Sequence, residues 1–491
     1  MIKNTLMIQG TTSSAGKSTL VAGLCRWLAL QGFSVAPFKP QNMSLNSVVT
    51  PDGNEISRAQ YLQALAAKIP PHVLMNPILL KPNQEMGCQV IVQGRSIGSF
   101  SAQTYQQNKP KLMPLVLESF HDLRQKYQNI LVEGAGSPAE INLREHDLAN
   151  MGFAEAIDCP VILVVDIDRG GAFAHLVGTL ALLSPSEQNR IIGFVINQFR
   201  GERKLLDSGL DWLEQRTKIP VLGVIPYLDN FHLAAEDSLN PPPSITSSPE
   251  TVLQVGILQL PHLSNPTDFD GLCQHPQVLV HWMKPEQKKR SVDCIIIPGS
   301  KNVRHDLQIL KNHDWDSYLR RHLRYYGKLL GICGGLQMLG NSIHDPLGLE
   351  GSSGQSDGLG FFAYQTTLQP QKILRSTTGT LASTGATLTG YEIHQGITPI
   401  QNQKPFSYYA DGTPEGVCSD DDLIRATYHH GLFDHPDAQR DLLHWMGIPH
   451  PQISNPNGQQ EEQLNRLAAV LDETLQWPLL LNYFTHPTGT L

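Results

Sequence analysis

Residues 5–20 read TLMIQGTTSSAGKSTL and place a glycine-rich loop between a short apolar run and a helical pattern. Leu20, Leu24 and Leu28 recur at helical spacing after the loop, and Gly32 ends that pattern. A loop between a strand and a helix can turn its backbone N–H groups toward phosphate, and the helix N-terminus adds a favourable dipole. This stretch therefore predicts a strand, a phosphate-binding loop and a helix.

The loop itself, GTTSSAGKS at 10–18, contains the side chains that a nucleotide site requires. Lys17 can neutralise the charge of a terminal phosphate, and Ser18 can ligate magnesium. Five residues separate Gly10 from Gly16, one more than in the common form of this loop, but the strand-loop-helix context supports the same role. We expect ATP and Mg²⁺ as cofactors, with ATP bound by Gly10, Thr11, Thr12, Ser13, Gly16, Lys17, Ser18 and Thr19.

Short apolar runs alternate with helical patterns through the rest of the first half. Such alternation is typical of a parallel β-sheet covered by helices, in which each strand is buried on both faces. The runs are centred near Leu6, Val35, Leu131, Val164, Phe194 and Val224.

Polar side chains stand where these runs end, and in an open parallel sheet the carboxyl ends of the strands form the ligand crevice. Glu133, which follows the run ILV, is the expected partner of Ser18 in binding magnesium, and Glu55 is a weaker candidate. An ordinary polar loop is the alternative for each remaining residue. The residues that we expect to face substrate or nucleotide are Lys39, Asn42, Arg58 and Asp166.

A proline- and serine-rich stretch, NPPPSITSSP at 240–249, divides the chain because it cannot form a regular element. Strand-like runs resume after it, so the second half is predicted to be another α/β domain. The expected division is a phosphate-loop domain at 1–239, a linker at 240–250, a second α/β domain at 251–450 and a helical tail at 451–491.

The second half contains a cysteine in a pattern typical of a nucleophile. Cys333 lies within GICGG, between a buried-looking strand and a helix, where small neighbours allow a sharp turn and the helix N-terminus favours thiolate. The N–H of Gly334 can then stabilise an oxyanion, and Gly299 in IIPGSKN is a candidate for the second wall of that site. A thiolate also needs a histidine, and RATYHHGLFDHP offers His429, His430 and His435 without local spacing that selects one.

Composition and charge restrict the class of protein. Lys and Arg total 37 against 45 Asp and Glu, which gives a net charge of -8. The chain therefore lacks the excess of positive charge that is typical of proteins that bind nucleic acid. The seven cysteines are scattered and lack the CxxC spacing of zinc or dithiol sites. No secretory signal opens the sequence and no apolar stretch is long enough to cross a bilayer, which predicts a cytoplasmic protein with no membrane partner. Its oligomeric state is left open.

Many motifs in order resemble the cobyric acid synthase family, the glutamine-dependent amidotransferases of corrinoid biosynthesis, over nearly the whole chain. The first half resembles the dethiobiotin-synthetase-like branch of P-loop enzymes, and the second resembles a class I glutamine amidotransferase. The motifs are GTTSSAGKS, FKPQNMSLNS, EISRAQ, LVEGAGSPAEINL, DIDRGGAFA, LPHLSNPTDFD, PGSKN, GICGGLQMLG, GYEIHQG and YHHGLFDH.

This resemblance implies a division of labour between the two halves. Cys333 would form a glutamyl thioester, and His430, at the histidine position of the family's Tyr-x-His-Gly-Leu-Phe motif, would move the proton. ATP would activate a carboxylate of the corrinoid substrate, adenosylcobyrinic acid a,c-diamide, and ammonia would amidate its b, d, e and g side chains. Many amidotransferases have a glutamate two residues after the histidine, where this chain has Leu432, so the third triad member is left open between Asp434 and Glu392.

Rival interpretations share some of these modules. The synthase that amidates the a and c carboxylates and the enzymes that amidate a cell-wall glutamate have both halves, but the domain order, FKPQNMSLNS and YEIHQG favour the cobyric acid branch. A regulatory P-loop ATPase of the partitioning type would have an extra lysine where this loop has Thr11. A binding protein with a decayed glutaminase is disfavoured by the intact turn around Cys333.

Overall fold

The computed structural model describes residues 1–83, 87–229, 231, 233, 252–453 and 455–486, and the expected linker at 240–250 lies outside them. The chain forms two compact units. The first comprises Met1–Thr50, Asn54–Asp237 and Gln459–Leu491, and the second comprises Pro51–Gly53 and Ser238–Gly458.

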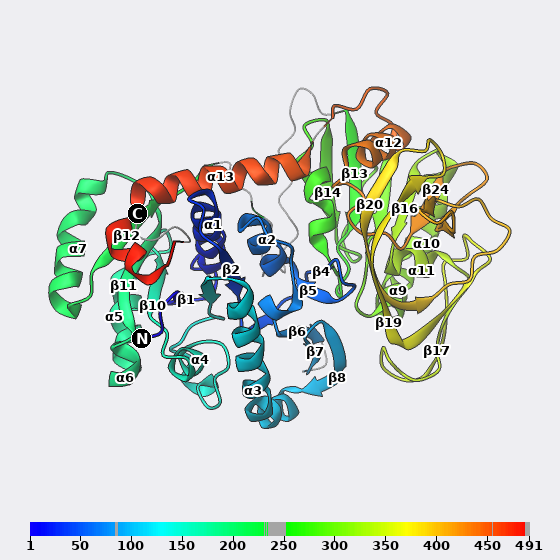
Figure 1. Cartoon of the computed structure of the whole chain (residues 1–491). Coiled ribbons are helices and arrows are strands. Elements are labelled where there is room, and N and C mark those ends of the chain that lie inside the picture. The colour runs from blue at the N-terminus through cyan, green and yellow to red at the C-terminus, as the bar shows by residue number, and fades with distance from the viewer. Residues whose placement is uncertain (84–86, 230, 232, 234–251, 454, 487–491) are drawn as a thin grey trace. The chain divides into compact units, whose positions relative to one another are not determined.

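Six parallel strands form the central sheet of the first unit, in the order β12-β11-β10-β1-β9-β2 (Figure 1). Every residue of β1 and of β10 is buried, as their apolar sequences require of strands covered on both faces. The strands are β1 (Thr5–Gly10), β2 (Val35–Phe38), β9 (Asn129–Glu133), β10 (Val161–Asp166), β11 (Ile191–Phe199) and β12 (Val221–Pro226). The sheet is thus the parallel α/β type that the sequence predicts.

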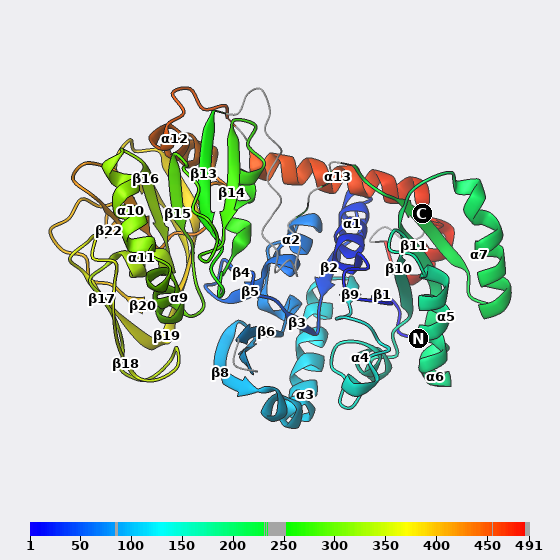
Figure 2. The ribbon, with the colours of Figure 1, turned by 180° about the vertical axis from the view of Figure 1, so that it is seen from behind.

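Helices connect these strands, and a small second sheet is inserted between β2 and α3. Figure 2 shows strands of this insertion beside α3. Its strands are β3 (Gln41–Met43), β6 (Ile78–Asn83), β7 (Gly87–Val92) and β8 (Arg95–Ser101), with the hairpin β4 (Ser47–Val49) and β5 (Glu55–Ser57). The helices are α1 (Lys17–Leu30), α2 (Arg58–Ala66), η1 (Val73–Met75), α3 (Ala102–Lys126), η2 (Ile141–Leu143), α4 (Met151–Ala156), α5 (Ala172–Leu182), α6 (Pro185–Gln188) and α7 (Arg203–Thr217).

The C-terminal segment returns to the first unit and packs on α1. It contains α13 (Pro456–Thr474), α14 (Trp477–Leu480) and η4 (Leu481–Tyr483). The Trp27 indole stacks on that of Trp477 and donates a 2.7 Å hydrogen bond to Asp472. Arg26, which is fully buried, pairs with Glu461 at 2.9 Å. Residues of the C-terminal segment from Leu464 to Phe484 are therefore part of the core that supports the phosphate-loop helix.

A second six-stranded sheet, of order β14-β13-β15-β16-β24-β23, forms the core of the other unit. All neighbours are parallel except β23 and β24. Its strands are β13 (Leu253–Leu258), β14 (Val278–Met283), β15 (Cys294–Ile297), β16 (Lys328–Ile332), β23 (Val417–Cys418) and β24 (Ile424–Thr427). This unit too has the α/β class that the sequence predicts.

The remaining strands of the second unit form a separate, mostly antiparallel sheet. They are β17 (Ser342–Asp345), β18 (Gly354–Asp357), β19 (Gln365–Leu381), β20 (Thr387–Ile397), β21 (Ser407–Tyr409) and β22 (Pro414–Glu415). The helices of this unit are η3 (Pro266–Phe269), α8 (Asp270–Cys273), α9 (Val303–Asn312), α10 (Trp315–Arg324), α11 (Gly334–Leu339) and α12 (Pro436–Met446). Among the described residues, no helix combines the length and the apolar character needed to cross a membrane.

Because the Trp477 ring is buried against Trp27, Trp477→Ala is expected to lower the free energy of unfolding of the first unit by about 3 kcal/mol, as for other buried aromatic truncations. Leu479→Ala on the same helix is the control, since that side chain is 42% exposed and its truncation leaves no cavity. Denaturant unfolding monitored by tryptophan fluorescence measures both. Equal losses in the two variants would show that the C-terminal segment does not stabilise this core.

Candidate functional site

Cys333 lies in a strained turn between β16 and α11. Its backbone has φ 53° and ψ −104°, and its N–H donates to the Thr427 carbonyl at 2.8 Å. The glycines around it permit close packing: a Cβ on Gly335 would lie 2.0 Å from the Ile297 oxygen, and one on Gly331 would lie 2.6 Å from Leu339. The glycine pattern read from the sequence is therefore a packing requirement of this turn.

The two glycines proposed for the oxyanion site lie beside this turn and beside His430. A Cβ on Gly334 would lie 2.8 Å from the backbone nitrogen of Ser300, the residue after Gly299. A Cβ on Gly299 would lie 3.6 Å from Cε1 of His430. The structure thus brings together Cys333, Gly334, Gly299 and His430, which the sequence had placed on separate segments.

A carboxylate that the sequence reasoning missed holds His430 in place. Asp268 Oδ2 lies 2.5 Å from Nδ1 of His430, and both side chains are almost fully buried. Asp268 Oδ1 accepts from the Tyr391 hydroxyl at 3.2 Å and from the Gly431 N–H at 3.3 Å. The carboxylate is therefore paired and hydrogen-bonded, as a buried charge requires.

The protonation of His430 follows from these neighbours. Burial alone would lower the pKa of the imidazole, but the charge and hydrogen bond of Asp268, with the nearby Cys333, outweigh burial and raise the pKa to about 10. The ring stacks on Tyr391 at a centroid distance of 5.2 Å, and its buried Nε2 has no hydrogen-bond partner of ordinary geometry among the described residues. An imidazolium held in this way favours the thiolate form of a neighbouring cysteine.

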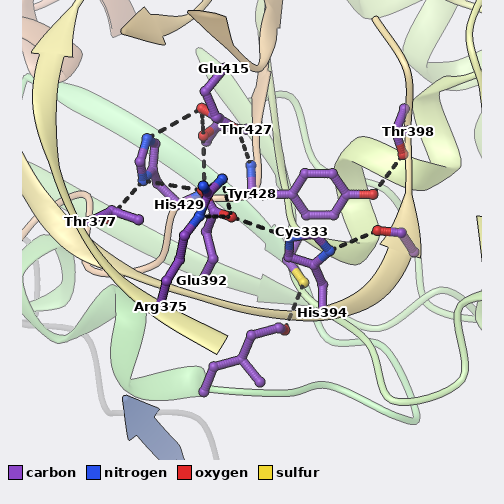
Figure 3. A network of polar contacts seen from close by, with 12 residues as sticks. Cys333, Arg375, Thr377, Glu392, His394, Thr398, Glu415, Thr427, Tyr428 and His429 are labelled. Carbon is purple, nitrogen blue, oxygen red and sulfur yellow. Dashed lines mark hydrogen bonds and ion pairs between the residues drawn. The ribbon is translucent and has the colours of Figure 1, made fainter. Parts of the chain in front are cut away.

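The two acids suggested for orienting His430 are replaced by Asp268. Glu392 instead binds Arg375, His394 and Tyr409, and this network lowers its pKa to about 2 against the opposing effect of burial. Figure 3 shows Glu392 with Arg375 and His394. Asp434 follows His430 in the chain, and its N–H donates to the Gly431 carbonyl. The sequence near His430 could not identify Asp268, because Asp268 is 162 residues away from it in the chain.

The other two histidines of the segment have different partners. His429 lies in the buried network of Figure 3, where its ring contacts the Thr377 hydroxyl. Its Nε2 also lies 3.1 Å from the Ser407 hydroxyl. The side chain of His435 caps α12 by accepting from the Asp437 N–H. His430 is thus the histidine of this segment that combines with Cys333 and a carboxylate, an arrangement suited to attack on an amide carbonyl.

The phosphate loop of the first unit has the geometry of an anion cradle. Gly16 adopts φ 96° at the start of α1, and a Cβ there would lie 2.0 Å from Nδ2 of Asn197, which donates to the Ala15 carbonyl at 3.0 Å. Lys17 Nζ donates to the carbonyls of Thr12, at 3.2 Å, and Gly136, at 3.0 Å. Glycine at position 16 is therefore required by the positive φ and by the close approach of the Asn197 amide, and it begins the helix whose N-terminus favours an anion.

Glu133 lies at the centre of a buried polar cluster beside this loop. Its Oε1 accepts from the Ser18 hydroxyl at 2.7 Å and pairs with Lys39 at 2.9 Å, and its Oε2 accepts from Gln63 at 2.5 Å. Burial would raise the pKa of this carboxyl, but Lys39 and these hydrogen bonds lower it below its usual range. A hydroxyl and an ionised carboxylate side by side form a donor set that fits Mg²⁺.

The other residues expected to face ligands lie in varied surroundings. The Glu55 carboxylate pairs with Lys81 and accepts from Ser47 Oγ at 2.7 Å, so its contacts have a structural role of their own. Asn42 donates to Ser57 and Gln60, at 2.9 and 3.0 Å. The Arg58 guanidinium lies over the Tyr61 ring at 5.7 Å, and Asp166, at the end of β10, pairs with Arg169 at 3.2 Å.

Of the eight loop residues assigned to ATP, the structure places all in the turn that joins β1 to α1 or at its two ends. Gln63 was missed because a glutamine inside a helix has no distinctive pattern in sequence. Asp268 lies in LPHLSNPTDFD, and the polar run after a strand was the one feature that could have indicated it.

Comparison with protein families gives two matches that together cover most of the chain. Residues 6–241 match the CobQ/CobB/MinD/ParA nucleotide binding domain. Residues 254–438 match the CobB/CobQ-like glutamine amidotransferase domain. The fold expected from the sequence, a P-loop-like parallel-sheet domain followed by a class I glutamine amidotransferase-like α/β domain, is confirmed.

Solved structures resemble parts of the chain at low identity. PurLQS from Thermotoga maritima is 11% identical over 44% of this chain and 97% of its own, with a TM-score of 0.29. A structure described as a glutamine amidotransferase is 14% identical over 40% of this chain and 99% of its own, with a TM-score of 0.30. Chloroplast FtsY from Physcomitrella patens is 15% identical over 46% of this chain and 58% of its own, with a TM-score of 0.27.

Asp268→Asn is expected to reduce glutamine hydrolysis by about 10³-fold or more, because an amide cannot hold the imidazolium of His430 in the same state. The variant should also change the dependence of stability on pH. With a folded pKa near 10, His430 contributes stability that is complete below about pH 6.5 and is lost as the pH rises toward 10. Unfolding measured between pH 7 and 9 should therefore show a flatter decline in the variant. An unchanged slope would contradict the raised pKa.

Gln63→Leu is expected to weaken binding of Mg²⁺ with ATP by about 10-fold or more, because the amide donor that orients Glu133 is lost. Titration of the protein with ATP at several Mg²⁺ concentrations measures this effect. Gln107→Leu, an exposed position on α3, is the control and should bind as the wild type does. Equal binding by both variants would remove Gln63 from the site.

Proposed function

The chain is an ATP-dependent glutamine amidotransferase of the CobB/CobQ type, and from that premise we propose that it amidates the b, d, e and g carboxylates of adenosylcobyrinic acid a,c-diamide. The observation that carries the proposal is the presence, in one chain, of a buried Cys333, His430 and Asp268 site and of a phosphate loop paired with Glu133. One half can release ammonia, and the other can activate an acid to receive it.

In the proposed glutaminase step, the Cys333 thiolate attacks the side-chain amide carbon of glutamine. Backbone N–H groups near Gly334 and Gly299 stabilise the oxyanion, and His430 gives its proton to the departing nitrogen, which leaves as ammonia. Water then attacks the glutamyl thioester, with His430 accepting a proton, to release glutamate and restore the Cys333 thiolate beside the protonated His430. Asp268 keeps the imidazole oriented and stabilises its charge throughout.

In the proposed synthetase step, a corrinoid carboxylate attacks the γ-phosphate of ATP and ADP leaves, which gives an acyl phosphate. Ammonia then attacks the acyl carbon and phosphate departs, leaving the amide. Lys17 and the loop backbone would hold the phosphates, and Ser18 with Glu133 would hold Mg²⁺, which neutralises charge developing on the phosphates. Lys39, now paired with Glu133, would become available to substrate or nucleotide when a cation takes its place.

The choice of acid is supported by sequence segments outside the shared machinery. FKPQNMSLNS supplies β3 and the cluster around Asn42, and YEIHQG supplies Tyr391, which contacts both His430 and Asp268. Both segments resemble the cobyric acid branch rather than the a,c-diamide or cell-wall branches. MinD and ParA are named in the description of the nucleotide binding domain, but a regulatory ATPase function would not use the thiol site of the second unit.

The test is the mass of adenosylcobyrinic acid a,c-diamide after incubation with the protein, Mg-ATP and glutamine. Four successive acid-to-amide steps are expected. Cys333→Ala should give none with glutamine and four with free ammonia, because only ammonia release requires the thiol. Cys418→Ala, away from the turn, is the matched control and should behave as the wild type does.

An unchanged corrinoid mass together with continued glutamine hydrolysis would refute the proposed acid. The substrates to assay are then cobyrinic acid, whose a and c carboxylates would be amidated, and cell-wall glutamate. Amidation by Cys333→Ala with glutamine would instead refute the role of the thiol.

A further inference from the structure

The loop 298–302, here called the oxyanion loop, is held within the second unit by hydrogen bonds to segment 262–264 and to Asp306. The segment before Asp268 holds one side: the Ser264 N–H donates to Gly299 at 3.0 Å, and the Lys301 N–H donates to the His262 carbonyl at 2.8 Å. Leu263 and Ser300 form an isolated antiparallel bridge between these pairs. The segment that supplies the histidine's carboxylate is thus paired with the loop that supplies the oxyanion wall.

Asp306 joins these two segments through a single buried carboxylate. It lies in the first turn of α9 and is 0% exposed. Its Oδ2 accepts from Ser300 Oγ at 2.6 Å and from the His262 N–H at 3.2 Å, and its Oδ1 lies 2.6 Å from His262 Nδ1. Each oxygen therefore bonds to a group beside the candidate active site.

The chemistry of this carboxylate differs from that of an ordinary buried ion pair. Among the described residues, the basic groups within ion-pair distance of this carboxylate are the imidazoles of His262, at 2.6 Å, and of the exposed His305, at 3.8 Å. Hydrogen bonds to a buried carboxylate depend on its negative charge, and loss of that charge weakens all of them together. The position of Ser300 therefore depends on its hydrogen bond to the Asp306 carboxylate.

A shift of Ser300 would affect the turn of Cys333, because Ser300 is packed against Gly334 of that turn. A Cβ on Gly334 would lie 2.8 Å from the Ser300 nitrogen and 3.4 Å from the Ser300 Cβ. The oxyanion loop and the turn of Cys333 are therefore in close van der Waals contact. Ser300 Oγ also accepts from the Asn302 N–H at 3.0 Å, which fixes the end of the loop. A shift of Ser300 would move the N–H groups that face the oxyanion.

We propose that Asp306 is a positioning residue for glutamine hydrolysis: its carboxylate holds the oxyanion loop through Ser300, and its bonds to His262 tie that loop to the adjoining segment 262–264. It acts on the stabilisation of the tetrahedral intermediate and leaves the reactivity of the thiol unchanged. The inference rests on the glutaminase half of the proposed function and is independent of which acid is amidated.

The experiment compares Asp306→Asn, Ser300→Ala and the double variant in glutamine hydrolysis and in alkylation of Cys333 by iodoacetamide. Alkylation reports the thiolate and needs no oxyanion site, so it separates the two effects. In Asp306→Asn and Ser300→Ala, kcat is expected to fall about 10²-fold, as for loss of an oxyanion donor, with KM nearly constant and alkylation unchanged. The double variant should be no worse than the poorer single variant, because both remove one interaction.

Asp345→Asn is the matched control. This carboxylate is also 0% exposed, and it bonds to the N–H groups of Leu349 and Glu350 and pairs with Arg304 at 3.5 Å, so its contacts differ from those of Asp306. It should retain the kcat of the wild type. Thermal unfolding of every variant identifies any that fails to fold. If Asp306→Asn fails to fold, Ser300→Ala still tests the proposal.

Three outcomes would overturn the proposal: an unchanged kcat in both single variants, an equal loss in Asp345→Asn, or a parallel loss of alkylation. Additive losses in the double variant would separate Asp306 from Ser300 and also overturn it. Failure of corrinoid amidation with these results intact would refute only the proposed acid. Absence of glutamine hydrolysis in the wild type would refute the glutaminase role itself.

Discussion

The hydrogen bond between Asp268 and His430 is the interaction on which the second unit's site depends. Burying a carboxylate and an imidazole is costly unless each is satisfied, and the neighbouring backbone is arranged to satisfy them. The His430 backbone pairs with that of Tyr391, and a Cβ on Gly390 would lie 2.1 Å from the His430 oxygen. Strand β20 therefore has to carry glycine where it passes the histidine, so that Tyr391 can stack on the ring.

Each unit has a buried carboxylate near the carboxyl ends of its parallel strands, and polar neighbours stabilise that carboxylate. In the first, Glu133 is ionised because Lys39, Ser18 and Gln63 surround it. In the second, Asp268 is held by a histidine, a tyrosine hydroxyl and a backbone N–H. Parallel strands direct their carboxyl ends to one edge, where loops from several strands can place polar groups that no single segment could supply.

Glycine spacing and side-chain partners have different origins in this chain. The glycines of GICGG and of the phosphate loop are needed locally, because a turn between strand and helix leaves no room for a Cβ, and such patterns are visible in sequence. The partners of Glu133 and His430 come from other elements and carry no such pattern. Gln63 is an interior residue of α2, and the Trp27 contact with Trp477 joins opposite ends of the chain.

The sequence by itself determined the two α/β domains, the phosphate loop and the nucleophile turn, because apolar periodicity and glycine-rich turns are local properties of a chain. The glutamine-dependent chemistry was indicated by the resemblance of its motifs to a family. His430 could be named only through a family motif, since three histidines lie together in that segment. Tertiary structure alone decided that Asp268 orients it, that Asp306 binds Ser300, and that the C-terminal helix supports α1. These contacts join residues far apart in the chain, which meet only when packing brings distant elements together.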